Sequence, residues 1–366
     1  MKFTIHREAL LVPLQQVIGV VERRQTLPIL GNLFLQASKS SLTVSATDLE
    51  VEIRASLQTP IDQPGETTVP ARKLLDICKA LPEEAQLEFS FSESRVQIRS
   101  GKSRFTLATL PGDEFPLVET IQGETKVSMS QGALRQLIER TSFSMAQQDV
   151  RYYLNGLLLE LSSSRLRAVA TDGHRLATCD ADAEVTLPGK QQVIVPRKGV
   201  QELVRLLTEG EEPVELEVGT NHLRATLRNV VFTSKLVDGR FPDYERVIPK
   251  GGDKQVLADR ELMRQALIRT SILSNEKYRG VRLTLDKNKL KVQTHNPEQE
   301  EADEEIEVSY AGKGLEIGFN VTYLLDVLGC IRGDQVEITL SDSNSSCLIE
   351  QPGSGQCRYV VMPMRL

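Results

Sequence analysis

The chain has 366 residues, 40% hydrophobic and 26% charged, which is the composition of a folded globular protein with two to three domains. It contains no run of 18 apolar residues, and charges flank the short apolar runs near Met1, so the sequence predicts neither a membrane span nor a secretory signal and indicates a cytoplasmic protein. The net charge of -6 taken alone argues against a nucleic-acid partner, because DNA binding depends on neutralising phosphates.

The five cysteines are scattered without CxxC or Cys/His spacing, which argues against both a disulfide framework and a zinc site. We therefore expect all of them to be reduced and structural, and we expect no metal and no cofactor. They are Cys78, Cys179, Cys330, Cys347 and Cys357.

One sequence pattern occurs three times along the chain. The segment Ser41 to Asp48 matches Arg165 to Asp172 and then Lys289 to Asn296, with the aligned leucines 124 residues apart each time. Val69-Pro70 and Val195-Pro196 are 126 residues apart, as are Phe115-Pro116 and Phe241-Pro242. A repeat that spans nearly the whole chain predicts three domains of one architecture, which we place at 1–122, 126–250 and 254–366.

Each repeat opens with an amphipathic helix, continues with short alternating strands, and then has a second helix and further strands. In chain order the helices are expected at 9–21, 70–80, 133–143, 196–208, 262–273 and 320–332. Pro70 and Pro196 suit a helix start, and Asn320 is a good N-cap at the equivalent third position. The predicted fold class is α+β, with three repeated domains that each pack two helices on antiparallel sheets.

The helical segments carry most of the positive charge. Counted with their flanking residues they contain 18 basic and 10 acidic residues, a net +8 in a chain whose total is -6. A positive set of helices on a negative body is typical of a protein that contacts a polyanion. If helices pack side by side in a circle with roughly 9 Å between their axes, six helices leave a central hole only about 7 Å wide. Twelve helices leave a hole about 24 Å wide, which is enough for duplex DNA. Two chains closed head to tail would supply twelve.

With this repeat and this charge pattern, the chain resembles the family of bacterial DNA polymerase III beta subunits, the replicative sliding clamps, from Met1 to Leu366. The most specific stretches are Thr26 to Asn32, Asp149 to Gly156, Ala170 to Leu176, Val193 to Val200, Ser234 to Tyr244, Ile272 to Lys277, Asn296 to Glu301 and Tyr359 to Leu366. The resemblance implies a ring-shaped, pseudo-six-fold homodimer, with helices lining the hole, that slides on duplex DNA and tethers polymerases. The implied partners are duplex DNA, the polymerase III alpha subunit, the clamp loader delta subunit, and other polymerases and repair proteins that bind through short peptide motifs; no membrane partner is implied.

The resemblance also assigns residues to DNA. Contacts to phosphate and sugar position a protein without reading sequence, so we expect weak, sequence-blind and salt-sensitive binding. The expected DNA-facing residues are Arg24, Arg72, Gln148, Tyr152, Tyr153 and Lys198. For the adjacent tyrosines Tyr152 and Tyr153, the default interpretation from the residues alone is the core and edge of a strand.

Opposite charges near the two ends of the chain suit a head-to-tail contact. The run Glu298 to Glu307 holds seven acidic residues and no basic one, and the first repeat offers a basic complement around two alternating apolar residues. The expected dimer interface comprises Lys73, Arg95, Lys102, Arg104, Phe105 and Leu107 with Ile272, Leu273, Glu298, Glu300, Glu301, Asp303 and Glu304. From the residues alone, the alternative interpretation is that these are independent, solvated surface charges.

The family resemblance places a cleft for partner peptides between the second and third repeats. Small, branched aliphatic and methionine residues would anchor a Leu or Phe of the peptide, and two arginines would meet its carbonyls or acids. The expected lining is Leu154, Thr171, Gly173, His174, Arg175, Leu176, Pro242, Arg246, Val247, Val360 and Met362, with Pro363, Met364 and Arg365 at the rim. Asn344 stands where relatives commonly have a small apolar residue, so we expect a slightly more polar cleft.

Two other classes of function stay open from the residues alone. An enzyme would use Asp172 and His174, which lie within one short segment, but the equivalent segments of the other repeats lack such a pair, and no P-loop or dinucleotide fingerprint is present. A ring-forming structural protein without a nucleic-acid partner is the second alternative, and the helix charge of +8 argues against it.

Overall fold

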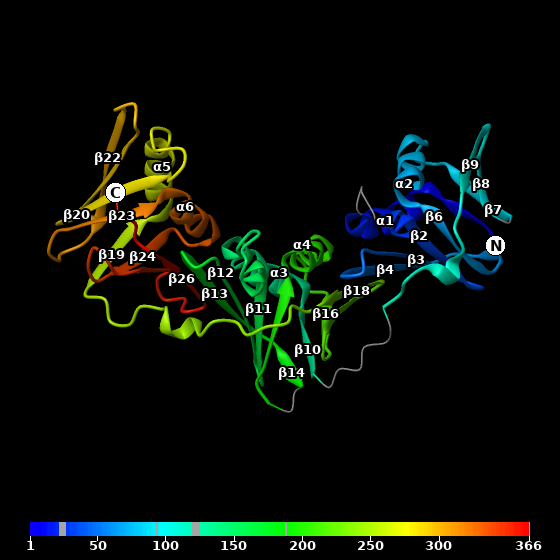
Figure 1. Ribbon diagram of the computed structural model, residues 1–366, viewed down its shortest axis with the longest axis horizontal. Coiled ribbons are helices and arrows are strands. Elements are labelled where there is room, and N and C mark those ends of the chain that lie inside the picture. Colours follow the sequence, from blue (N-terminus) through cyan, green and yellow to red (C-terminus); the bar gives the residue numbers. More distant parts are fainter. Residues whose placement is uncertain (22–26, 93, 119–124, 187–188, 366) are drawn as a thin grey trace. The chain divides into compact units, whose positions relative to one another are not determined.

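The structure is a computed structural model that describes residues 1–21, 27–92, 94–118, 125–186 and 189–365. These residues form two compact units, one of Met1–Gly132, Glu184–Pro188 and Lys198–Leu236, the other of Ala133–Ala183, Gly189–Arg197 and Val237–Leu366. Figure 1 labels the helices and strands. No helix among the described residues is both long and apolar enough to cross a membrane.

The first unit contains two antiparallel sheets. The smaller has the order β5-β1-β7-β8-β9, and the larger has the order β14-β10-β16-β17-β18-β4-β3-β2-β6. The strands of the smaller sheet are β1 (Lys2–His6), β5 (Ile61–Gln63), β7 (Gln86–Ser92), β8 (Arg95–Ser100) and β9 (Ser103–Ala108). Those of the larger sheet are β2 (Asn32–Ala37), β3 (Ser41–Thr47), β4 (Val51–Gln58), β6 (Gly65–Pro70), β10 (Thr125–Ser130), β14 (Glu184–Thr186), β16 (Pro213–Val218), β17 (His222–Leu227) and β18 (Val230–Lys235).

The second unit is built on one antiparallel sheet of twelve strands, in the order β15-β11-β12-β13-β26-β25-β24-β19-β22-β21-β20-β23. Its first strands are β11 (Gly156–Ser162), β12 (Arg165–Thr171), β13 (Arg175–Asp182), β15 (Gln191–Pro196), β19 (Lys254–Asp259) and β20 (Gly280–Asp286). The remainder are β21 (Lys289–His295), β22 (Glu301–Ser309), β23 (Leu315–Asn320), β24 (Gln335–Leu340), β25 (Cys347–Glu350) and β26 (Cys357–Val361).

All six predicted α-helices are present. They are α1 (Arg7–Val17), α2 (Ala71–Ala80), α3 (Gln131–Glu139), α4 (Arg197–Leu206), α5 (Arg260–Ser271) and α6 (Val321–Cys330). The side chain of Asn320 accepts the backbone N–H of Thr322 at 2.9 Å, which confirms the predicted N-cap. In the second unit α5 and α6 lie side by side (Figure 1), over a core that includes Leu267 and Leu324.

Two helices give way to 3-10 turns within the ranges predicted for them. The α1 helix ends at Val17 and a 3-10 turn covers Ile18–Val20, while α3 ends at Glu139 before a 3-10 turn at Ser142–Ser144. At the end of α3 the hydroxyl of Thr141 donates to the carbonyl of Leu137 at 2.8 Å. A threonine that bonds the carbonyl four residues back competes with continued helix hydrogen bonding, so the apolar pattern continues where the helix does not.

The predicted α+β fold of three clamp domains is confirmed, but the sheets continue from one repeat into the next. In the first unit β18 pairs with β4, and in the second β13 pairs with β26 from Arg175↔Val361 to Cys179↔Cys357. The compact units therefore group strands of different repeats, and the repeat boundaries at 122, 126, 250 and 254 stay predictions.

The expectation that every cysteine is reduced is wrong for two of them. Cys179 and Cys357 form a disulfide, while Cys78, Cys330 and Cys347 are free thiols. The two bonded residues are 178 positions apart in sequence and meet because β13 and β26 are neighbours in the sheet. Local spacing rules see only nearby cysteines, and so the sequence gives no sign of this pair. Burial raises the pKa of the free Cys78 and Cys347 thiols to about 12.

Candidate functional site

The segment Thr171 to Arg175 is a tight turn fixed by its own side chains. Asp172 Oδ1 accepts the backbone N–H groups of His174 at 2.9 Å and Arg175 at 3.0 Å, and the Thr171 hydroxyl donates to the Arg175 carbonyl. Gly173 has φ +89°. The turn thus uses the carboxylate of Asp172 to hold the chain, and it leaves the His174 side chain exposed.

The first repeat makes the same turn with different residues. Asp48 Oδ1 accepts from the backbone N–H groups of Glu50 and Val51 at 2.9 and 2.7 Å, and Leu49 takes the left-handed conformation of Gly173 with φ +76°. Because this turn lacks a histidine and keeps its geometry, the Thr-Asp sequence is a structural device of the repeat.

A pocket of about 210 Å³ lies beside the Thr171–Arg175 turn in the second unit. It is lined by Arg151, Leu154, Thr171, Gly173, His174, Arg175, Leu176, Pro242, Tyr244, Val247, Val360 and Met362. Leu154, Leu176, Tyr244 and Val360 also belong to the buried core cluster beneath it, so its floor is rigid and apolar.

The pocket brings together ten of the eleven residues expected to line the cleft. Arg246 is not among them; its side chain is 85% exposed and pairs with Asp243 at 2.7 Å. Sequence reasoning missed Arg151 and Tyr244 as lining residues, although both lie within the specific stretches quoted above. Asn344 does not line the pocket either; its backbone N–H binds Asp342 in an exposed loop.

The guanidinium of Arg175 makes three hydrogen bonds within the protein. Its Nε donates to Asp172 at 3.2 Å, its Nη2 to the Phe143 carbonyl at 2.8 Å, and its Nη1 to Asp326 of α6. Its guanidinium also lies over the ring of Tyr323, 4.5 Å from the centroid. All three of its nitrogens have acceptors within the protein, so Arg175 positions the turn against α6, and the expectation that it also meets the carbonyls of a peptide stays a prediction.

A second arginine supports the pocket from below. Arg167 donates to both carboxylate oxygens of Asp180, at 2.6 and 2.9 Å, and to the hydroxyl of Tyr244 at 3.1 Å. The hydrogen bonds with Asp180 raise the pKa of Arg167, and burial raises the pKa of Tyr244, so the arginine is charged and the phenol neutral. This network fixes the Tyr244 ring, which forms part of the pocket floor.

Two backbone hydrogen bonds anchor the C-terminal residues. The N–H of Met362 donates to the His174 carbonyl, and the N–H of Met364 donates to the Gly318 carbonyl, both at 2.9 Å. Met362 lines the pocket, whereas Met364 and Arg365 line a different cavity of about 380 Å³ with Tyr278 and His295. Of the residues expected at the rim, Pro363 lines neither cavity.

Three of the expected DNA-facing residues lie on one loop of the second unit. Gln148 and Tyr152 are exposed, and the Tyr153 ring meets the Tyr152 ring edge-on at 5.9 Å while packing against the core. Arg151 on this loop forms a two-point pair with Asp149, at 3.0 and 2.8 Å. These hydrogen bonds lower the pKa of Asp149 to about 2.

The other expected DNA-facing residues belong to the first repeat and to α4. Arg72 on α2 is exposed and donates to the Val21 carbonyl at 2.9 Å. The ammonium of Lys198 pairs with Asp48, whose side chain is almost buried. Arg24 lies outside the described residues.

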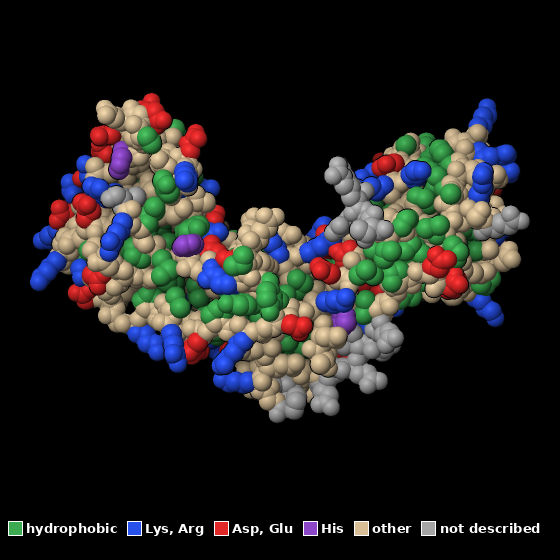
Figure 2. Space-filling model, in the orientation of Figure 1, with side chains coloured by type: hydrophobic (Ala, Val, Ile, Leu, Met, Phe, Trp, Pro, Cys, Tyr) green, Lys and Arg blue, Asp and Glu red, His purple; other side chains and the backbone are tan. Residues whose placement is uncertain are grey.

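In the first unit, β9 is an edge strand with an apolar and basic character. Among the described strands it pairs only with β8, with Phe105 opposite Ile98 and Leu107 opposite Val96. Phe105 and Leu107 are half-buried, and Figure 2 shows basic side chains gathered over this end of the sheet. Arg95, Arg99, Lys102 and Arg104 are exposed basic residues of β8, β9 and the turn between them, and Lys73 of α2 is also exposed.

In the second unit, β22 carries the acidic run. Residues Glu301–Glu307 pair with β21, and β19 joins β22 only at Val308 and Ser309, so among the described strands one edge of the acidic segment is unpaired. Ile272, at the end of α5, is 75% exposed. Glu304 is bonded within the chain to Arg269, with one contact at 3.0 Å, and the pKa of its carboxyl is lowered by that hydrogen bond. Of the acidic residues expected at the interface, Glu298, Glu300, Glu301 and Asp303 are exposed.

The chain matches family models along nearly its whole length. The matches are to the DNA polymerase III beta subunit N-terminal domain at residues 1–119, its central domain at 128–243 and its C-terminal domain at 245–365. The chain is 59% identical to the beta sliding clamp of Pseudomonas putida and 53% identical to that of Escherichia coli, with full coverage of both proteins in each case. A crystal structure of the sliding clamp of Pseudomonas aeruginosa bound to griselimycin superimposes with a TM-score of 0.96 at 57% identity and full coverage of both chains.

Proposed function

The chain belongs to the family of DNA polymerase III beta subunits, the beta sliding clamps, and on this premise we propose that it encircles duplex DNA as a ring-shaped dimer and tethers polymerases to it. The observation that carries the proposal is the run of three consecutive domain matches over residues 1–365. A clamp of this family is a processivity factor and not a catalyst, in agreement with the structural use of Asp172.

We propose that the pocket beside the Thr171–Arg175 turn takes the short peptide motifs of partner proteins. Its apolar floor suits a Leu or Phe side chain, and Met362, 43% exposed, supplies an adaptable wall. The peptide-like ligand in the solved clamp of Pseudomonas aeruginosa supports ligand binding by this family. Of the arginines that line the pocket, Arg151 is the half-exposed one, and it is the residue of this set that would meet an acidic peptide.

The two unpaired strand edges support a head-to-tail dimer. An extended strand edge is a template for another strand, and β9 is basic where β22 is acidic. We propose that β9 of one chain lies against β22 of the other, with Ile272 and Leu273 packed on Phe105 and Leu107. Glu304 then contributes less than Glu300 and Glu301, because Arg269 already neutralises it.

DNA would be held by contacts to its backbone. Arg24, Arg72, Gln148, Tyr152, Tyr153 and Lys198 are the proposed residues, and binding should weaken steeply as salt rises because counterions are released. Lys198 must exchange Asp48 for phosphate to take part, so its contribution should be smaller than that of Arg72.

The named partners follow from the family. We propose that the polymerase III alpha subunit, the clamp loader delta subunit, and other polymerases and repair proteins compete for the peptide pocket, and that the protein acts in the cytoplasm. Deletion of Met362 to Leu366 should abolish binding of these partners and leave the dimer intact, because it removes Met362 from the pocket wall and takes no residue from β9 or β22.

A topological experiment tests the proposed function. The full-length protein is loaded onto a nicked circular duplex with ATP and a clamp loader of the family, and DNA-bound protein is separated by gel filtration before and after one restriction cut. A sliding ring stays on the circle and is lost from the linear product. Equal retention on both DNAs would contradict encirclement, and a strong preference between two duplex sequences at equal salt would contradict sliding.

A further inference from the structure

The disulfide between Cys179 and Cys357 closes one end of a strand pair that we call the seam. The seam is the set of five residue pairs between β13 and β26, from Arg175↔Val361 to Cys179↔Cys357. Beyond the disulfide, the N–H of Asp180 donates to the Gln356 carbonyl at 3.0 Å. Since β13 belongs to the second repeat and β26 to the third, this one covalent bond links two repeats inside the second unit.

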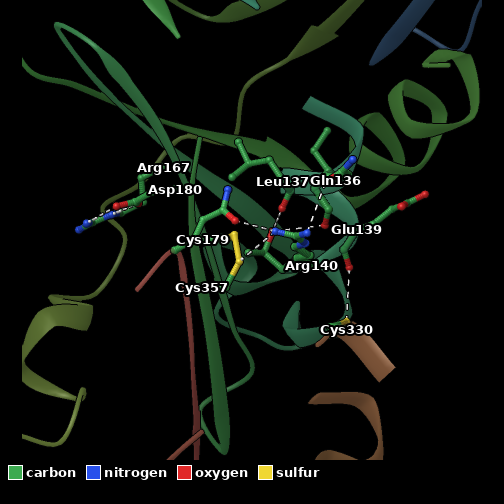
Figure 3. The surroundings of a disulfide bond; sticks show 12 residues. Gln136, Leu137, Glu139, Arg140, Arg167, Cys179, Asp180, Cys330 and Cys357 are labelled. Carbon is green, nitrogen blue, oxygen red and sulfur yellow. Dashed lines mark hydrogen bonds and ion pairs between the residues drawn. A yellow bond between two sulfur atoms is a disulfide. The ribbon is translucent and has the colours of Figure 1, made fainter. Parts of the chain in front are cut away.

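The two sulfurs have different surroundings. Cys179 is 1% exposed, whereas Cys357 is half-buried. Figure 3 shows the Arg140 side chain beside the disulfide, and its Nη1 lies 3.8 Å from Cys357 Sγ. The same nitrogen donates to Gln356 Oε1 at 2.9 Å, and Nη2 donates to Gln136 Oε1 at 3.4 Å, so the guanidinium is held in place.

A cation next to a partly accessible sulfur favours the thiolate, which is the reactive form in disulfide exchange. Cys357 therefore has the features of an attacking and leaving thiolate, and Cys179 those of a buried resolving thiol. Of the other described cysteines, Cys78 and Cys347 are buried. Cys330 is partly exposed and also near Arg140, but its thiol donates to the Glu139 carbonyl at 3.8 Å and burial raises its pKa to about 11.

We propose that Cys179 and Cys357 are a reversible thiol–disulfide modification site that fastens the seam when oxidised. The natural co-reactant class is a small disulfide such as oxidised glutathione. The Cys357 thiolate attacks one glutathione sulfur and releases the first glutathione thiolate; Cys179, on losing its proton, attacks Cys357 Sγ and releases the second. One glutathione disulfide is reduced to two thiols as two protein thiols become one disulfide. The proposal goes beyond the clamp function and does not depend on it.

The seam has a second end, and there it forms part of the peptide pocket. Leu176 and Val360 are paired across it and both line the pocket, as does Arg175. A cross-link at one end restricts separation of the two strands, so oxidation should slow local opening of the whole seam. Slower opening would be seen as slower hydrogen exchange of the seam amides, and this expectation does not depend on which ligand the pocket takes.

The first experiment counts thiols in the full-length protein. Samples equilibrated in reduced or oxidised glutathione are quenched with acid, alkylated in denaturant and digested for mass spectrometry. We expect five alkylated cysteines under reducing conditions and three under oxidising conditions, with the peptides of Cys179 and Cys357 linked. Cys330→Ser, which removes a thiol near the same Arg140, should still form the link, and either Cys179→Ala or Cys357→Ser should prevent it.

The second experiment tests the role of Arg140. Arg140→Gln should slow formation of the link several-fold, whereas Arg135→Gln, on the α3 helix that ends just before Arg140, should leave the rate unchanged. Two results would overturn the proposal: five alkylated cysteines in excess oxidised glutathione, or a link that reduced glutathione leaves intact in the native protein. Seam amides in β13 and β26 should exchange more slowly in the oxidised sample than in the reduced one, and equal exchange would exclude the fastening role.

Discussion

At the scale of single residues, the turn around Gly173 shows how a repeated structural element acquires a function. Thr47-Asp48 and Thr171-Asp172 make the same hydrogen bonds, and the second turn lines the pocket of about 210 Å³. There the left-handed position is a glycine, and a β-carbon on it would meet Arg151 Nη2 at 3.2 Å. Leu49, in the equivalent left-handed position, has no such role in the pocket. The two turns therefore share their hydrogen bonds and differ in the residue at the left-handed position and in the side chains packed beside it.

Gly173→Ala should therefore harm the pocket more than it harms folding. The φ of +89° makes the substitution cost on the order of 1 kcal/mol of stability, and the new methyl group also displaces Arg151. Gly251→Ala is the matched control, since Gly251 has φ +79° and open space around it. Urea unfolding should give similar losses for both variants. A fluorescent peptide carrying Leu or Phe should bind more weakly to Gly173→Ala only; equal affinities would show that this turn does not shape the site.

The pair of Asp149 and Arg151 predicts a pH-dependent contribution to stability. The folded-state pKa of Asp149, about 2, is below the ordinary value of 3.8, so the ionised form is favoured in the folded protein. This stabilisation is complete above about pH 4 and is lost as pH falls toward 2. Asp149→Asn should accordingly lower the unfolding midpoint at pH 7, and the gap to the parent protein should narrow by pH 2.5. Asp238→Asn serves as an exposed control, and a gap independent of pH would contradict the assignment.

At the scale of helices and strands, local sequence predicts the elements better than their partners. The period of apolar residues and the caps predicted all six helices, because these signals act within a few turns. The pairing of β18 with β4 and of β13 with β26 joins segments more than 170 residues apart, and no local signal encodes it. For the same reason the disulfide was missed. The pocket residues came from family resemblance, and the locked state of Arg175 depends on Asp326, which only the fold brings near.

The C-terminal segment after β26 should divide into two functional parts. Met362 lines the peptide pocket, and Met364 lines the neighbouring cavity. Met362→Ala should weaken peptide binding by more than about fivefold, since truncating a central contact commonly costs over 1 kcal/mol. Met364→Ala, an identical change two residues on, should have a smaller effect. Fluorescence anisotropy with one peptide measures both, and a larger loss for Met364→Ala would move the site toward the second cavity.

At the scale of the whole molecule, a head-to-tail dimer lets each chain present both an acceptor and a donor edge. The contact occurs twice in a closed ring, so a change at β9 or β22 acts on two interfaces at once. The acidic run also bears on the net charge of -6: seven acidic residues lie in one segment that the proposed dimer contact would cover, whereas the helical segments counted with their flanking residues carry a net +8. The net charge of the chain is therefore a poor guide to its partner.

The dimer contact can be tested by loss and by rescue. Ile272→Ala with Leu273→Ala should give monomers, because each buried apolar side chain lost costs roughly 2 to 5 kcal/mol.

Lys102→Glu with Arg104→Glu should also weaken the dimer, since it sets like charges against Glu300 and Glu301. Adding Glu300→Lys and Glu301→Lys to the same chain restores opposite charges across both interfaces and should restore the dimer. Lys39→Glu, exposed in a loop outside the proposed interface, controls for net charge. Sedimentation at low micromolar concentration distinguishes the states; a charge-reversed protein that stays dimeric, or a double reversal that stays monomeric, would show that β9 and β22 do not meet.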